Sequence, residues 1–210
     1  FYFCAMKFLK DISFKEKRVI IRVDFNVPLN DELEITDETR IVAALPSINY
    51  VLDSGGAAVI ISHLGRPSGV DLKLSLKPVS KKLSNLLKRP VNFLDDCVGD
   101  HVEQAIKNSN SGDVFLLENL RFYNEETNGD MLFSEKLSRL GDAYINDAFG
   151  TSHRAHASTH GVVGFFEKEK YCGLLLEKEI VNLNKALNQN ITPSLAIIGG
   201  AKISSKIEVL

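Results

Sequence analysis

The sequence has few cysteines and almost no net charge. Its three cysteines, Cys4, Cys97 and Cys172, are an odd number without CxxC or CxxH spacing, which excludes a disulfide framework and a zinc site of that kind. Such cysteine usage is typical of a reducing compartment, and we expect a cytoplasmic protein. With a net charge of −2 and no apolar run near the roughly 18 residues of a membrane span, neither a nucleic-acid nor a membrane partner is expected.

Several catalytic motifs are also lacking. The sequence has no Ser-His-Asp arrangement, HExxH pair, GxGxxG fingerprint or Walker A loop, and it has no repeats or low-complexity tracts. The 210 residues, of which 44% are hydrophobic, suggest a globular protein of one or two domains with a full core. The opening FYFCA looks unrelated to the rest of the sequence, so we expect residues 1–5 to be an expression scar before a native start at Met6.

Short apolar runs alternate with helical patterns along the chain. The runs are continuously hydrophobic, which indicates strands covered on both faces, as in a parallel sheet. Strands are expected at 18–23, 57–61, 113–117, 142–146 and 194–198, with a weaker one at 91–94. Helices are expected at 37–53, with Asp37 as N-cap, and at 76–88, 99–107, 134–140 and 174–188. The order predicts an α/β fold, a doubly wound parallel sheet with helices on both faces in a Rossmann-like three-layer sandwich.

Five of the eight arginines fall at or after the predicted carboxyl ends of strands, where ligands bind in open parallel sheets. They are Arg22, Arg40, Arg66, Arg121 and Arg154, accompanied by His63, His153, His156, Asp24 and Asn26. Because guanidinium groups bind phosphate and carboxylate oxygens in pairs, we expect a ligand with at least two anionic groups. The alternative is a set of rim salt bridges with Asp24, Asp37, Glu38 and Glu118 as partners. His101 and His160 are expected to be structural.

Asp24, beside Asn26, has two compatible interpretations: it orients a substrate hydroxyl, or it holds Arg22 by a salt bridge. A second pattern lies in SLAIIGGAKISSKIEVL at the C-terminus. An apolar strand, Gly199-Gly200 and a helix start bearing Lys202 and Lys206 would bring backbone N–H groups and two ammonium groups to a polyphosphate. A strand, two glycines and a helix also form a common turn, so a purely structural role stays open.

Six stretches, in this order, resemble the phosphoglycerate kinase family: RVDFNVP, TRI, SHLGRP, ENLRF, NDAFGTSHRAHAS and GGAKISSKI. The resemblance covers essentially the whole chain from about Lys7. It implies that 3-phosphoglycerate or 1,3-bisphosphoglycerate is bound by Asp24, Asn26, Arg40, His63, Leu64, Gly65, Arg66, Arg121 and Arg154, with Arg22 as a neighbour. It further implies that Gly200, Lys202 and Lys206 contact the nucleotide phosphates or the transferred phosphoryl group. Arg40 and Lys202 are the implied catalytic residues.

The resemblance also implies a monomeric glycolytic and gluconeogenic phosphotransferase that uses Mg²⁺ with ADP or ATP and a carboxyl group as acceptor. Residues 6–173 are then the N-terminal substrate-binding domain, 174–193 an interdomain helix and linker, and 194–210 the start of a nucleotide-binding domain. The chain stops at Leu210, so the rest of the nucleotide site is expected to be missing and the fragment inactive alone. Ser205 departs from many relatives, which have an acidic residue there. The rival hypothesis is a stand-alone module that senses a phosphorylated metabolite.

Overall fold

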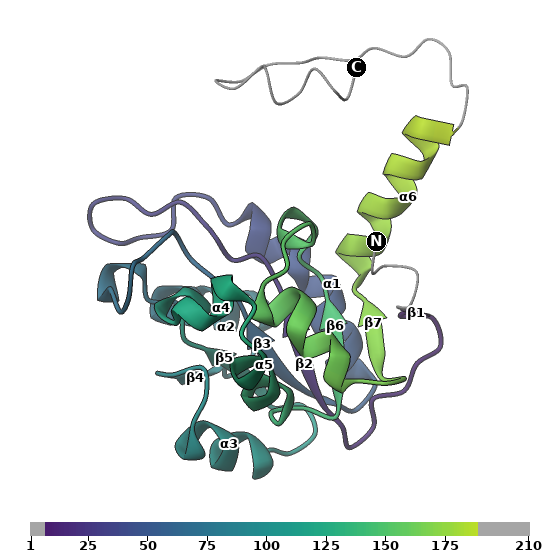
Figure 1. The fold of residues 1–210 in the computed structure, drawn as a ribbon, viewed down its shortest axis with the longest axis horizontal. Helices are drawn as coiled ribbons and strands as arrows, with labels where there is room; N and C mark the ends of the chain where they lie inside the picture. Colours follow the sequence, from purple (N-terminus) through teal and green to yellow (C-terminus); the bar gives the residue numbers. More distant parts are fainter. Residues whose placement is uncertain (1–6, 189–210) are drawn as a thin grey trace. The chain divides into compact units, whose positions relative to one another are not determined.

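A seven-stranded sheet, parallel at every pairing, forms the centre of the computed structural model, which describes residues 7–188 (Figure 1). The strand order is β1-β7-β6-β2-β3-β5-β4. The strands are β1 (Lys7–Phe8), β2 (Arg18–Arg22), β3 (Ala57–Ile61), β4 (Asn92–Leu94), β5 (Val114–Leu117), β6 (Ala143–Asn146) and β7 (Lys170–Cys172). The predicted doubly wound parallel sheet is confirmed.

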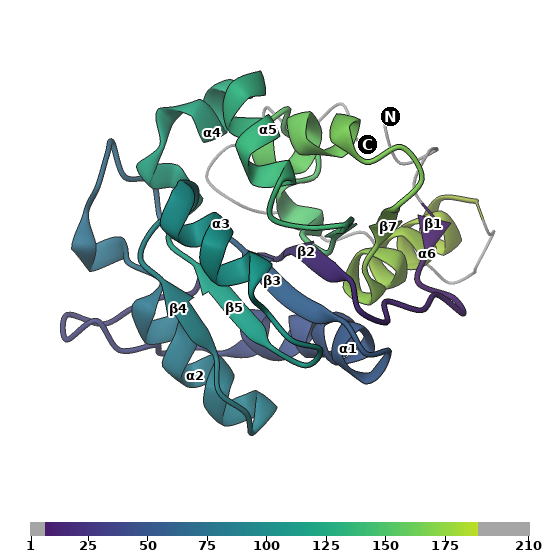
Figure 2. The same ribbon diagram turned by 90° about the horizontal axis from the view of Figure 1, so that it is seen from below.

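Helices cover both faces of this sheet. The helices of the described residues are α1 (Thr39–Asp53), α2 (Lys77–Leu87), α3 (Asp100–Lys107), α4 (Asn124–Asn128), α5 (Met131–Ser138) and α6 (Leu174–Asn188). Short 3₁₀ or π turns connect them at Leu72–Leu74, Leu120–Phe122, Phe149–Thr151, Ala157–Gly161 and Val162–Phe165. Figure 2 shows α1 and α2 on one side of the central strands, and α3 and α5 on the other.

The two hydrophobic cores follow from the alternation of side chains along the strands. Ile21 of β2 and Ile60 of β3 belong to the core that α1 and α2 cover. Ile20 and Val59, their neighbours in sequence, belong to the core under α3 and α5. Continuous apolar strands are therefore needed, because each strand supplies side chains to both layers.

The predicted element boundaries need two corrections at helix starts. The helix expected from residue 37 begins at Thr39, with Glu38 in the N-cap position, although the Asp37 carboxylate accepts the Thr39 N–H at 2.8 Å. The helix expected from residue 134 begins at Met131, because Asp130 caps it by accepting the Phe133 N–H at 2.8 Å. Strands β1 and β7 and helix α4, all short, were not predicted. The strand expected at 194–198 lies outside the described residues.

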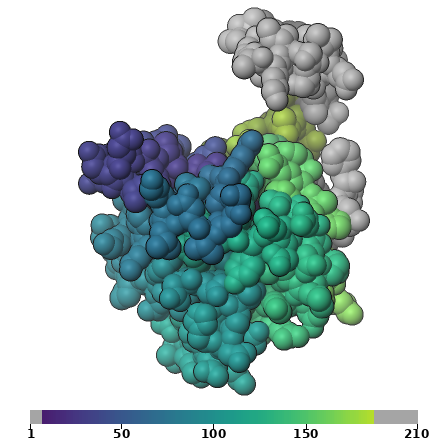
Figure 3. All heavy atoms as spheres, turned by 60° about the vertical axis from the view of Figure 1, so that its left-hand side comes forward, coloured from purple at the N-terminus to yellow at the C-terminus, as the bar shows by residue number. Residues whose placement is uncertain are grey.

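The loop between β2 and α1 is closed by an antiparallel bridge between Leu29 and Ile35 and projects from the surface (purple in Figure 3). Within residues 7–188, no helix is long and apolar enough to cross a membrane.

The chain divides into two compact units, Phe1–Glu179 and Ile180–Leu210. The first unit contains the sheet, both cores and the start of α6. There, one Asp147 carboxylate oxygen accepts the N–H groups of Leu175 and Leu176, at 2.9 and 3.1 Å. Of the second unit, the structure describes only the continuation of α6 to Asn188.

Candidate anion-binding site

The carboxyl ends of four strands lie side by side at one edge of the sheet. Arg22 at the end of β2 is in register with Ile61 of β3 and Asn146 of β6, and Ile60 is in register with Leu116 of β5. Because all four strands are parallel, the loops after them leave the sheet at the same edge. These loops and the nearby start of α1 carry Asp24, Asn26, Arg40, His63, Arg66, Arg121 and Arg154.

Two asparagine side chains hold the SHLGRP loop. Asn119 accepts the Leu64 N–H at 3.1 Å and donates to the carbonyl oxygens of Leu64 and Leu74, at 2.7 and 2.9 Å. Asn26 accepts the Gly65 N–H at 2.8 Å. Gly65 has a φ of +64°, and a Cβ there would lie 2.9 Å from the Leu74 side chain, so the turn requires glycine. Hydrogen bonds with Asn119 and Asn26 therefore fix the conformation of this loop.

Three arginines line one open cavity of about 290 Å³. Arg66, Arg121 and Arg154 surround it together with Pro67 and Thr127, and no acidic residue is in its lining. Arg66 is exposed and has neither a hydrogen bond nor an ion pair within residues 7–188. Guanidinium groups gathered without a carboxylate leave their positive charge available to a ligand, and their planar geometry suits phosphate oxygens.

The neighbouring positive charges affect the pKa of Arg121. Its side chain is largely buried and donates to the carbonyl oxygen of Gly65. Burial lowers the pKa of Arg121, and the positive charges of Arg154 and Arg22 lower it further, against the opposing effect of Glu126. Arginine nevertheless stays protonated in proteins. An anion bound in the cavity would relieve the mutual repulsion of these charges.

Behind the cavity, Arg22 is fully buried in a polar network. Its Nε donates to the Ser158 hydroxyl at 2.9 Å, one Nη donates to the carbonyl oxygen of Val23, and the other lies 3.1 Å from His63 Nδ1. Ser158 in turn donates to Glu126 through its hydroxyl at 2.6 Å and its N–H at 2.9 Å. Glu126 is also fully buried, so it balances the Arg22 charge through Ser158.

Among the histidines of the site, His63 is not a source of positive charge. Burial, followed by the charges of Arg22 and Arg121, lowers the pKa of His63 to about 2, so its imidazole is neutral. Because arginine can only donate, His63 Nδ1 accepts from Arg22 and its proton resides on Nε2. His156 lies with Nδ1 at 3.7 Å from Glu126 Oε1, and burial lowers its pKa as well. His153 is exposed, with its Nε2 at 3.4 Å from Arg154 Nε.

The alternative hypothesis predicts salt bridges between rim arginines and acidic residues. Among the described residues, one such salt bridge is formed. Arg40 Nη1 lies 2.5 Å from Asp24 Oδ2, and about half of the Arg40 side chain stays exposed. The expected pairing of Asp24 with Arg22 is not observed, because Arg22 is held by the buried network instead. The other three acidic candidates are engaged elsewhere: Asp37 with the Thr39 N–H, Glu38 with Lys82, and Glu118 with the Leu76 N–H.

The comparisons with known proteins concern the family of the chain. A model of the phosphoglycerate kinase family matches residues 9–210. The chain belongs to the phosphoglycerate kinase family. It is 54% identical over 205 residues to a phosphoglycerate kinase of Chlorobaculum tepidum, and 52% identical over 202 residues to one of Dictyoglomus turgidum. These matches cover 97% and 96% of this chain, but only 51% and 50% of the relatives.

Solved phosphoglycerate kinases also share the fold. The crystal structure of the enzyme from Pyrococcus horikoshii OT3 matches with a TM-score of 0.88 at 36% identity, covering 97% of this chain and 51% of that one. The structure from Coxiella burnetii matches with a TM-score of 0.82 at 35% identity, covering 95% of this chain and 49% of that one. The chain therefore spans about half the length of the phosphoglycerate kinases that it matches.

The nucleotide-phosphate residues implied by the resemblance to phosphoglycerate kinases, Gly200, Lys202 and Lys206, lie outside the described residues. Within residues 7–188, reasoning from the sequence missed three residues that shape the site. Asn119 was overlooked, although its place directly after the β5 strand puts it at the rim. The sequence around Glu126 and Ser158 does not indicate that they are buried. An acidic residue in a short polar helix and a serine in a loop are usually solvated.

Proposed function

We propose that this chain is the substrate-binding half of a phosphoglycerate kinase. The complete enzyme would transfer a phosphoryl group reversibly between 1,3-bisphosphoglycerate and ADP, giving 3-phosphoglycerate and ATP in glycolysis and gluconeogenesis. The observation that carries this proposal is the cavity lined by Arg66, Arg121 and Arg154 without a carboxylate. Membership of the phosphoglycerate kinase family supports it.

In this proposal, the three arginines bind the phosphate group that 3-phosphoglycerate keeps throughout the reaction. Paired N–H donors on each guanidinium match the oxygens of a phosphate, and their charges add. Leu64 and Gly65 line the substrate site as part of the preshaped SHLGRP loop. Asn26 uses its amide oxygen to hold that loop, which leaves its NH₂ group for the substrate. His63, neutral and protonated on Nε2, would act as a hydrogen-bond donor.

The proposed catalytic role of Arg40 rests on its exposure and on its partner. Half of its side chain is exposed, and Asp24 orients the guanidinium. The acceptor in ATP-dependent phosphorylation is a carboxylate that is already ionised at neutral pH, so the reaction needs no general base. Arg40, together with Lys202, would instead neutralise charge on the oxygens of the migrating phosphoryl group. Asp24 could in addition accept the substrate hydroxyl.

We also propose the domain assignment implied by the family: a substrate-binding domain at 6–173, a linker at 174–193 and the start of a nucleotide-binding domain at 194–210. The division of the chain between Glu179 and Ile180, inside the proposed linker, supports it. Mg²⁺ with ADP or ATP would bind mainly to the nucleotide-binding domain. Among residues 7–188, no group of three or more His, Cys, Asp or Glu could hold a metal ion, so we derive no step through magnesium. We further propose a cytoplasmic monomer.

A coupled ATP assay tests the function. The natural protein, measured by intact mass, should be about twice the length of this chain and should phosphorylate 3-phosphoglycerate, since its relatives are twice as long. The 210-residue chain should show no turnover in the same assay. Turnover by the isolated chain, or a natural protein of this length that binds 3-phosphoglycerate without turnover, would contradict the proposal; the second result would support a sensing module.

A further inference from the structure

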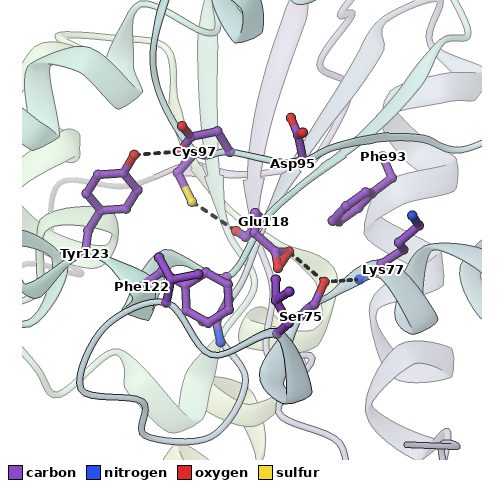
Figure 4. Close-up of a pocket in the computed structure, with 12 residues that line it drawn as sticks. Ser75, Lys77, Phe93, Asp95, Cys97, Glu118, Phe122 and Tyr123 are labelled. Atoms are coloured by element: carbon purple, nitrogen blue, oxygen red, sulfur yellow. Dashed lines mark hydrogen bonds between the residues drawn. The ribbon is translucent and has the colours of Figure 1, made fainter.

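A second cavity lies at the same edge of the sheet, beyond the ends of β4 and β5. Its volume is about 410 Å³. Figure 4 shows the side chains that line it, none of which lines the arginine cavity. The charges around it have the opposite sign. Asp95, Asp96 and Glu118 contribute three carboxyl groups to the lining, against the single ammonium group of Lys77. Unlike its neighbour, this cavity therefore favours a positively charged occupant.

The Glu118 carboxyl group has one oxygen without a partner. Glu118 is 6% exposed, and Figure 4 shows it projecting among the side chains that line the cavity. Its Oε2 accepts the Ser75 hydroxyl at 3.2 Å and the Leu76 N–H at 3.1 Å, whereas Oε1 is buried without a hydrogen bond. Burial raises the pKa of Glu118, although the hydrogen bonds from Ser75 and Leu76 oppose this effect. An unsatisfied buried acceptor is costly and calls for a donor.

The walls of the cavity are apolar and partly aromatic. Phe93, Phe122 and Tyr123 line it and are half-buried. Val70 and Leu72 line it as well, and they are 76% and 77% exposed. A ligand with a flat apolar body would cover these side chains, and the aromatic faces would attract a positive charge.

We propose that this cavity binds a small organic cation, an amine or amidine on a flat apolar body, whose N–H group donates to Glu118 Oε1 while its body packs against Phe93 and Phe122. A metal ion does not fit, because no group of three or more ligating side chains comes together among residues 7–188. An anion would face three carboxyl groups. The site is distinct from the proposed phosphoglycerate site and does not depend on it.

Titration of the full chain with benzamidine, followed by two-dimensional NMR, tests this inference. Benzamidine should bind at millimolar concentrations, with the largest shifts around Glu118 and Phe93. Benzamide, which has the same shape without the charge, should bind about tenfold more weakly or not at all, because a charged hydrogen bond is lost. Glu118→Gln should weaken benzamidine binding by about tenfold or more for the same reason, whereas Glu32→Gln, an equal charge change at an exposed position, should not.

A second variant tests the same cavity independently, so that the test does not depend on the folding of Glu118→Gln. Leu72 is exposed, so Leu72→Arg should fold normally, and it should weaken benzamidine binding by placing a positive charge beside the cavity. Four outcomes would overturn the proposal: no binding of benzamidine, equal binding of benzamide, equal affinity in Glu118→Gln and Glu32→Gln, or unchanged affinity in Leu72→Arg.

Discussion

Replacing Arg66 by alanine should weaken the binding of 3-phosphoglycerate while leaving the stability of the fold nearly unchanged. Arg66 is exposed and makes no hydrogen bond or ion pair in the described part of the chain, so the fold does not rely on it. The free energy of unfolding should change by less than about 0.5 kcal/mol, as for most surface substitutions. Its guanidinium nevertheless lines the cavity with Arg121 and Arg154, so the variant should lose one of three charged anchors for the phosphate group.

The size of the binding loss follows from the contacts that Arg66 is expected to make. Hydrogen bonds to charged groups contribute about 1.5–3 kcal/mol, and each 1.4 kcal/mol corresponds to about tenfold in affinity. Because Arg66 is hydrated in the free protein, the lower end of this range applies, and Arg66→Ala should weaken 3-phosphoglycerate binding about tenfold. In the full-length enzyme, the same loss should chiefly raise the KM for 3-phosphoglycerate.

Titration calorimetry with 3-phosphoglycerate measures this loss directly. Arg139→Ala is the matched control, because Arg139 is exposed directly after the last residue of α5, where it pairs with Glu135, and its replacement removes the same charge. The control should bind like the unmodified chain. An affinity of Arg66→Ala within twofold of the unmodified chain, or an equal loss in Arg139→Ala, would refute the reasoning, the latter because overall charge rather than a local contact would then govern binding.

Three further predictions concern the same site. Binding of 3-phosphoglycerate should weaken as salt rises, since partly exposed charges are screened over about 8–10 Å at physiological ionic strength; calorimetry at several salt concentrations checks this. Arg40→Ala in the full-length enzyme should lower kcat roughly a hundred- to a thousand-fold in steady-state kinetics, by analogy with a lost oxyanion donor; a near-normal kcat would make Arg40 only an anchor. Ser158→Ala should lower the free energy of unfolding, measured by urea denaturation, by about 2–3 kcal/mol, because Arg22 and Glu126 lose their buried hydrogen bonds to the Ser158 hydroxyl. The control Ser138→Ala should change this free energy by less than about 0.5 kcal/mol.

The central strands could be predicted because their residue types reflect where they lie. AAVII at 57–61 must face a core on both sides, and only a continuous apolar run satisfies both layers. Strand β1 has no such constraint, since both of its residues are exposed, and nothing in its composition marks it. Helix α5 was placed three residues late because its hydrophobic pattern is weaker evidence for a boundary than its Asp130 cap.

The site was predictable where strand order determines it. Arg66 and Arg121 follow strands that pair with each other, so parallel topology alone brings their loops together. The buried network behind them was not predictable, because Ser158 and Glu126 meet across 32 residues of sequence without any periodic pattern. The neutral state of His63 also depends on its burial and on the nearby arginines, which the sequence does not reveal.

NMR observation of the arginine Nε–Hε groups during titration with 3-phosphoglycerate tests the central claim most directly. Arg66, Arg121 and Arg154 line one cavity, and their resonances should shift together and saturate at one ligand per chain. Arg89 and Arg139, which lie outside that cavity's lining, should not shift. Shifts at Arg89 or Arg139 of equal size, or no shift at the three cavity arginines, would contradict the proposal that this cavity binds the phosphate group of the substrate.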